Sequence, residues 1–251
     1  MTITSDEELE RLKAIGRIVA QTLERMGKAL RPGMTTGELD AIGAKLLAEA
    51  GARSAPQITY DFPGATCISV NEEIAHGIPG DRMIAAGDLV NIDVSAEKDG
   101  VFADTGASFV VPPVADVLER LCRDGRKAMW TGIRAVKAGA PMADIGTAIG
   151  RFASSKGYTL IRNLASHGIG YSLHDEPREI ATWPDRSERR RMANGLVFTI
   201  EPFLSLGGKV AVESDKDDGW TLVAEPQALC VQYEHTVVAT RQGPLVVTLA
   251  A

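Results

Sequence analysis

The chain has 251 residues, of which 45 % are hydrophobic and 24 % are charged, and its formal net charge is −6. This composition is typical of a globular protein with one large domain or two small halves. It argues against nucleic acid as the main partner, because phosphate binding requires clustered Lys and Arg residues. The one basic cluster, RSERRR at 186–191, is typical of a solvated turn or helix face.

The cysteine content and the lack of a long apolar run indicate where in the cell the protein is located. Cys67, Cys122 and Cys230 form no CxxC pair, which is typical of a protein in a reducing compartment. No run of about 18 apolar residues exists that could span a bilayer, and MTITSDEELERL at the N-terminus lacks the basic and apolar regions of a signal peptide. We expect a cytoplasmic protein without a membrane partner.

The first 50 residues predict two helices. Ser5 and Glu8 form a capping box, and apolar residues then recur at helical spacing as far as Met26. Pro32 and Gly33 end this first helix. A second helix is expected over residues 38–50, before Gly51.

A similar helical pattern returns later in the chain. Residues 29–51 align without gaps on residues 135–157, with glycines matching at 33 and 139 and at 51 and 157. Each segment precedes β-rich stretches, at 87–94 and 100–111 in the first case and at 195–204 and 228–240 in the second. The pattern predicts a single α+β domain over residues 1–251, with two similar halves, about 1–112 and 113–251, each with an antiparallel sheet backed by helices.

The two β-rich runs around Asp99-Gly100 predict a hairpin, because this dipeptide favours a two-residue turn. Such a turn pairs Ser95 with Asp104. Asp93 and Asp104 then lie on one face, roughly 7 to 8 Å apart at the backbone, so that their carboxylates can converge.

Glu201 and Glu234 are placed in the same way, in the apolar stretches VFTIEP and VQYEHTVV. Four carboxylates in apolar strands repel one another unless cations accompany them. A histidine-bearing loop, SHGIGYSLHDEP at 166–177, is near in sequence. Oxygen ligands with a single imidazole suit two divalent first-row ions such as Mn, Fe, Co or Zn, and such a pair favours hydrolysis.

Other catalytic patterns are incomplete. FADTGAS at 102–108 resembles the Asp-Thr-Gly loop of aspartic proteases, but the second loop that this mechanism requires is absent. GxSxG and GxxxxGK[ST] do not occur. Cys67 has no flanking cysteine-protease signature and is expected to be a buried strand or pocket residue.

Five motifs in order resemble the type I methionine aminopeptidases of the pita-bread fold: SVNEEIAHGIPG, GDLVNIDVSAEKDGVFADTGASFVV, SHGIGYSLHDEP, VFTIEPFL and VQYEHTVVAT. The resemblance implies that a bridging metal-bound hydroxide attacks the scissile carbonyl. It implies five ligands for two metal ions, with Asp104 and Glu234 bridging both: Asp93, Asp104, His167, Glu201 and Glu234.

The resemblance also assigns catalytic roles. His76 faces the scissile amide, His174 donates to the substrate carbonyl, and Glu201 is the general base. His235 points to the opposite strand face by alternation, so its expected role is structural. The implied substrates are nascent polypeptides or peptides with a free N-terminal methionine and a small second residue. A monomer is implied, and ribosome association through 186–191 stays open.

The pocket expected to hold the first side chain of the substrate differs from that of the family at three positions. Phe62, Cys67 and Trp220 keep the expected character, while Pro56, Thr59 and Leu173 stand where the family has cysteine, tyrosine and phenylalanine. Thr59 and Leu173 are still expected to contact substrate. Two alternatives follow: another pita-bread peptidase, such as an Xaa-Pro peptidase or a creatinase-like enzyme, with different first-residue specificity, and an inactive pita-bread protein that binds a partner.

Overall fold

The computed structural model describes residues 1–250, and its first two helices are α1 (Asp6–Ala29) and α2 (Thr36–Glu49). Each begins with a capping box. The Ser5 hydroxyl accepts the N–H of Glu8 at 3.2 Å, and the Thr35 hydroxyl accepts the N–H of Glu38 at 3.1 Å. The first predicted helix is confirmed. The second starts two residues earlier than predicted, because Thr35 provides its cap.

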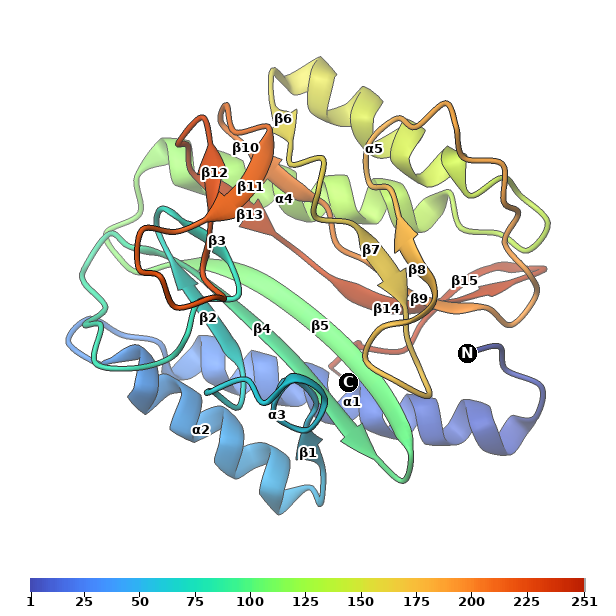
Figure 1. Ribbon diagram of the computed structural model, residues 1–251, viewed down its shortest axis with the longest axis horizontal. Helices are drawn as coiled ribbons and strands as arrows, with labels where there is room; N and C mark the ends of the chain where they lie inside the picture. Colours follow the sequence, from blue (N-terminus) through green and yellow to red (C-terminus); the bar gives the residue numbers. More distant parts are fainter. Residues whose placement is uncertain (251) are drawn as a thin grey trace.

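The predicted hairpin is confirmed by β4 (Leu89–Lys98) and β5 (Val101–Val110), which pair Ser95 with Asp104. Both turn residues have positive φ, 52° at Asp99 and 77° at Gly100, as a turn that matches the strand twist requires. α1 packs on this hairpin, with α2 beside it (Figure 1). The smaller elements of this half are β1 (Arg53–Ser54), α3 (Ala55–Tyr60), β2 (Cys67–Val70) and β3 (Glu73–Ala75).

The second half repeats the helix pair with α4 (Asp116–Arg134) and α5 (Ala143–Lys156), which lie across the molecule from α1 and α2 (Figure 1). Its largest sheet has five strands, in the order β15 (Gly243–Val246), β14 (His235–Thr240), β9 (Val197–Ile200), β7 (Ser166–Gly168) and β8 (Asp175–Ile180). The remaining strands are β6 (Thr159–Leu160), β10 (Phe203–Ser205), β11 (Val210–Glu213), β12 (Leu222–Glu225) and β13 (Cys230–Gln232).

The turn that joins α1 to α2 resembles the turn that joins α4 to α5. Gly33 and Gly139 both have φ of 86°, a conformation that favours glycine. The Gly33 N–H donates to the Ile84 carbonyl and the Gly139 N–H to the Met192 carbonyl, both at 2.8 Å. The fold is therefore α+β with antiparallel sheets backed by helices, as predicted. The division of the chain near residue 112 stays a prediction.

Two separate apolar cores stabilise this arrangement. One lies between α1, α2 and the β4–β5 hairpin, and the other between α4, α5 and the five-stranded sheet. A third, small cluster is centred on Phe203 and Ile161. Within residues 1–250, none of the helices is both long and apolar enough to cross a membrane.

The predicted strands at 195–204 and 228–240 are each interrupted. β9 ends before Glu201-Pro202 and β13 ends before Tyr233-Glu234. β9 pairs with β14 in the five-stranded sheet, whereas β10 pairs with β13 in a separate sheet. Pro202 has no N–H to continue a ladder, and the N–H of Glu234 donates to the Gly106 carbonyl of β5 at 2.9 Å. Both segments thus change sheets at their glutamates.

A candidate metal centre and substrate cavity

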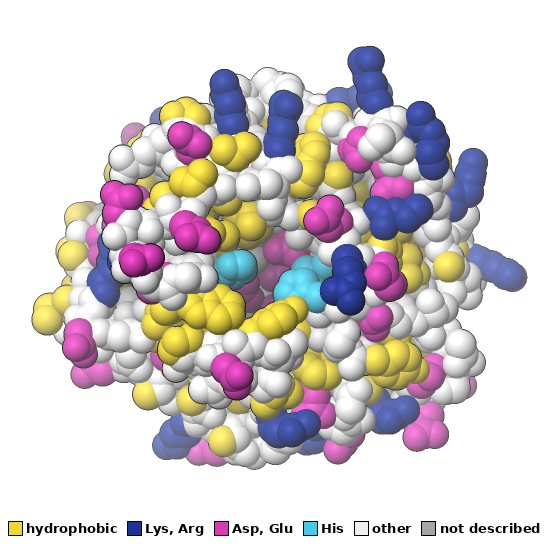
Figure 2. Space-filling model, in the orientation of Figure 1, with side chains coloured by type: hydrophobic (Ala, Val, Ile, Leu, Met, Phe, Trp, Pro, Cys, Tyr) yellow, Lys and Arg dark blue, Asp and Glu magenta, His cyan; other side chains and the backbone are white. Residues whose placement is uncertain are grey.

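A cavity of about 480 Å³ opens between the two halves. Figure 2 shows it as a hollow in the middle of one face, with histidine and acidic side chains inside and hydrophobic side chains along one rim. Most of the residues nominated from the sequence line it: Pro56, Phe62, Cys67, His76, Asp93, Asp104, His167, Leu173, His174, Glu201 and Trp220.

Three buried residues at its floor can hold one metal ion. Asp104, His167 and Glu234 each offer a ligand atom, and these atoms lie within 4.8 Å of one another. Glu201 joins them, because its Oε1 is 3.4 Å from Nε2 of His167. Asp93 lies two residue pairs along the hairpin from Asp104, on the same face. The ligands implied by the resemblance therefore gather from β4, β5, β7 and the two strand interruptions.

His167 presents a lone pair to this group. Its Nδ1 lies 2.9 Å from the carbonyl oxygen of Gly168, and a carbonyl can only accept, so Nδ1 carries the proton. Burial lowers the pKa of His167 to about 3, so the imidazole is neutral at pH 7. Nε2 is then free to bind a cation. The hydroxyl of Thr199 accepts from the backbone N–H of His167 at 3.1 Å and donates to Glu201 Oε1 at 2.8 Å, which orients the Glu201 side chain.

The carboxylates at the floor of the cavity are suited to positive charge. Burial raises the pKa of Glu201 to about 8 and raises the pKa values of Asp93, Asp104 and Glu234, with mutual repulsion adding to the last two. Among the described residues, Asp104 Oδ1 and Glu234 Oε1 are buried side-chain oxygens without a hydrogen-bond partner. Buried polar atoms are normally satisfied, so divalent cations fit these residues.

Gln232 forms hydrogen bonds with two of these carboxylates, and it was not predicted from the sequence. Its Nε2 donates to Glu234 Oε2 at 3.1 Å and to Asp93 Oδ2 at 3.4 Å, while its Oε1 accepts from Asn91 at 2.9 Å. A Cβ at Gly106 would lie 2.4 Å from Gln232 Oε1, so this glycine leaves room for the amide. The position of Gln232, two residues before Glu234 on a β-rich segment, is the sequence signal that could have identified it.

The remaining histidines separate into two groups. His76 and His174 line the cavity, and burial lowers the pKa of His76 and brings that of His174 to about 4. His76 has a positive φ of 53°, a strained conformation that is common at functional sites. His235 instead contacts Trp130 and has its Nδ1 2.9 Å from the Thr248 hydroxyl.

One set of residues that line the cavity is largely apolar. Phe62 and Trp220 meet edge to face at 5.2 Å between ring centroids, and Cys67, whose thiol pKa is raised by burial, and Leu173 line the same cavity. The placement of Thr59 needs correction. Thr59 is exposed and lies outside the lining, whereas its neighbour Tyr60 is part of it. Successive residues of a helix point about 100° apart around its axis, so Tyr60 can face the cavity while Thr59 faces solvent.

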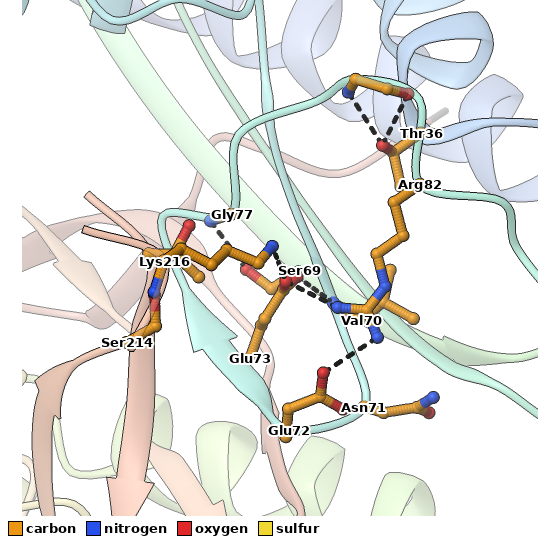
Figure 3. A network of polar contacts seen from close by, with 12 residues as sticks. Thr36, Ser69, Val70, Asn71, Glu72, Glu73, Gly77, Arg82, Ser214 and Lys216 are labelled. Carbon is orange, nitrogen blue, oxygen red and sulfur yellow. Dashed lines mark hydrogen bonds and ion pairs between the residues drawn. The ribbon is translucent and has the colours of Figure 1, made fainter. Parts of the chain in front are cut away.

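A polar network holds the segments that carry His76 and Trp220 (Figure 3). The buried Glu73 of β3 accepts from the N–H of Val70 at 2.9 Å and from Arg82 at 2.6 Å, and it also pairs with Lys216. Arg82 belongs to the segment that follows His76, and Lys216 to the loop that leads to Trp220. Glu73 thus joins two segments of the cavity wall that are distant in sequence.

Replacing Glu73 by Gln is expected to lower the free energy of unfolding by about 2 kcal/mol, because two cations lose a charged acceptor. Urea unfolding monitored by Trp fluorescence measures this loss. Glu72→Gln is the matched control. Glu72 is exposed and meets Arg82 at 3.1 Å, so its loss should cost less than about 1 kcal/mol. Equal effects of the two substitutions would contradict a stabilising role for the buried carboxylate.

Comparisons of the sequence and of the structure with known proteins identify the same family. Residues 10–241 match the model of metallopeptidase family M24. The chain is 46 % identical to methionine aminopeptidase 2 of Bacillus subtilis (strain 168) over 99 % of both chains, and 37 % identical to methionine aminopeptidase of Escherichia coli (strain K12) over 99 % of this chain and 94 % of that protein. The crystal structure of methionine aminopeptidase from Rickettsia prowazekii superposes with a TM-score of 0.94 at 34 % identity, covering 99 % of this chain and 100 % of that one.

Proposed function

The chain belongs to metallopeptidase family M24, and we propose that it is a methionine aminopeptidase acting on proteins and peptides with a free N-terminal methionine. The observation that carries the proposal is the group of Asp104, His167 and Glu234, whose ligand atoms lie within 4.8 Å of one another, while Asp104 Oδ1 and Glu234 Oε1 lack a hydrogen-bond partner among the described residues.

The proposed metal ligands are Asp93, Asp104, His167, Glu201 and Glu234. Two divalent ions bound there would polarise a carbonyl and lower the pKa of water. Manganese, iron, cobalt and zinc all suit an oxygen-rich site with one imidazole. Gln232 orients two of the carboxylates through the hydrogen bonds to Glu234 and Asp93.

The chain's own residues perform the remaining steps. Glu201, whose Oε1 lies 3.4 Å from His167 Nε2, takes up the proton of the attacking water. His174 donates a hydrogen bond to the scissile carbonyl and to the oxyanion that forms from it. His76 is placed to assist departure of the amide nitrogen. Phe62, Cys67 and Trp220 contact the methionine side chain, while Leu173 and Pro56 shape the pocket that sets its selectivity.

Peptide cleavage tests the proposal. Purified protein reconstituted with Mn²⁺ or Co²⁺ is expected to release methionine from Met-Ala-Ser and to leave acetyl-Met-Ala-Ser intact, because the free amino group is part of what is recognised. Liquid chromatography of the products measures both rates. Equal cleavage of the blocked peptide, or no cleavage with any of the four candidate metals, would contradict the proposal.

Two further comparisons define the substrate. Leu-Ala-Ser tests the selectivity of a pocket that contains Leu173 and Pro56, and Met-Trp-Ser tests the proposed preference for a small second residue. Cleavage of Leu-Ala-Ser as fast as Met-Ala-Ser would favour another first-residue specificity. A monomeric state, a cytoplasmic location and ribosome association through 186–191 stay predictions.

A further inference from the structure

Tyr60 and His174 meet at one side of the cavity. The Tyr60 hydroxyl oxygen lies 2.6 Å from Nδ1 of His174, and the two ring centroids are 5.6 Å apart. Tyr60 ends α3, whereas His174 precedes β8, so the contact joins segments 114 residues apart. Its two groups are a histidine with a proposed catalytic role and a tyrosine to which no role has been assigned.

The direction of this hydrogen bond decides what the other ring nitrogen can do. A neutral imidazole carries one proton, on Nδ1 or on Nε2. If Nδ1 carried it, Nε2 would present a lone pair and could not donate to a substrate carbonyl. If the phenol donates to Nδ1, the proton lies on Nε2, which is the nitrogen left available to a ligand in the cavity.

The surroundings of Tyr60 favour donation by the phenol. Burial raises the pKa of Tyr60 above its ordinary value, so the hydroxyl keeps its proton. Within residues 1–250, His174 is the only side chain that forms a hydrogen bond with this hydroxyl. A phenol is also a better donor than acceptor, because its oxygen lone pairs are delocalised into the ring.

His167 provides an internal comparison. Its ring centroid is 4.1 Å from that of His174, yet its Nδ1 faces a carbonyl, which fixes the proton on Nδ1. The Nδ1 atoms of these two adjacent imidazoles thus have different hydrogen-bond partners, a carbonyl acceptor for His167 and a phenol donor for His174. The carbonyl of Gly168 leaves His167 with a lone pair for a cation, and the phenol of Tyr60 leaves His174 with an N–H for a substrate.

We propose that Tyr60 is a positioning residue that donates to Nδ1 of His174 and thereby holds the His174 proton on Nε2, where it can bond the scissile carbonyl. This role rests on the proposed aminopeptidase function. It also gives a physical meaning to the placement of Tyr60, rather than Thr59, in the cavity wall.

Tyr60→Phe tests the proposal, because it removes the hydroxyl and keeps the ring at a position that is 43 % exposed. Nitrogen-15 NMR of the histidine side chains of the zinc-loaded protein reports the tautomer, with the His174 signals assigned by their loss in His174→Asn. We expect wild-type His174 to carry its proton on Nε2 and the variant to show a mixture. With Met-Ala-Ser, kcat should fall about 10-fold, the equivalent of one net hydrogen bond, while KM changes less than about twofold.

Tyr171→Phe is the matched control. It removes a hydroxyl that lies 2.6 Å from Glu8 Oε1, on the loop that carries His174, and should change neither the tautomer nor kcat. A wild-type proton on Nδ1, an unchanged tautomer in Tyr60→Phe, or an unchanged kcat despite a shifted tautomer would each overturn the positioning role. Failure of the wild-type protein to cleave any methionyl peptide would instead overturn the proposed function, since the NMR measurement does not depend on turnover.

Discussion

Replacing Asp104 by Asn is expected to abolish tight metal binding and, at the same time, to make the metal-free protein more stable. Burial raises the pKa of Asp104, and repulsion from the nearby Asp93 and Glu201 adds to this shift. An amide removes one charge and supplies N–H donors to carboxylates nearby. We expect the free energy of unfolding of the metal-free protein to rise by about 1 to 3 kcal/mol.

The same substitution removes a ligand, so the affinity for Mn²⁺ or Co²⁺ should fall about 100-fold or more, and activity should fall with it. Isothermal titration calorimetry measures the affinity, and thermal unfolding with and without metal measures the stability. His76→Ala is the control. Because the proposed role of His76 is toward the substrate and not the ions, this variant should keep its metal affinity and lose about 10²-fold or more in kcat. Loss of metal in His76→Ala, or a less stable metal-free Asp104→Asn, would contradict the assigned roles.

The stability of the metal-free protein is expected to fall as the pH rises from 6.5 to about 8. Glu201 has an ordinary pKa of 4.5 that burial raises to about 8, so in this range it is ionised in the unfolded chain but protonated in the folded one. Its favourable contribution is complete below pH 4.5 and is lost as the pH rises to its folded pKa. One pH unit in this range corresponds to about 1.4 kcal/mol per group, so Glu201 alone should account for a loss of at most about 2 kcal/mol.

The window starts at pH 6.5 because histidines act in the opposite direction below it. Burial lowers the pKa of His167 to about 3 and that of His174 to about 4, and their contribution is lost as the pH falls below 6.5. Urea unfolding of the metal-free protein at pH 6.5, 7.2 and 8 measures the dependence. Asp104→Asn should weaken this dependence of stability on pH. Bound metal should reverse its direction, because metal binding requires ionised carboxylates. A stability that rises with pH in the metal-free protein would contradict the raised pKa values.

Local signals explain which parts of the site could be predicted. The Asp99-Gly100 turn fixes the register of the hairpin by itself, and with it the placement of Asp93 beside Asp104. The capping box of Ser5 and Glu8 likewise fixes the start of α1 through contacts within one turn. Such features depend on a few adjacent residues, and the sequence therefore specifies them directly.

Other features depend on partners that are distant in sequence. The interruptions at Glu201 and Glu234 arise because each segment pairs with one sheet before the glutamate and with another after it, which the alternation of apolar residues does not reveal. The phase of α3 is set by packing, because a helix of 6 residues is too short to have a clear apolar face. Tyr60 was consequently missed, as was Gln232, whose importance lies in contacts to Asn91 and Asp93 on another strand.

The change of sheets at Glu201 and Glu234 also affects how the protein unfolds. The two main apolar cores are distinct clusters, although the first also includes Val197 and Val238 of the five-stranded sheet. The proposed ligands are Asp93 and Asp104 from the first half and His167 and both glutamates from the second. Without cations, we expect repulsion among the four carboxylates to weaken the coupling between these cores. Cations shared by both halves tie the cores together, so that metal loading should convert a broad transition into a single cooperative one.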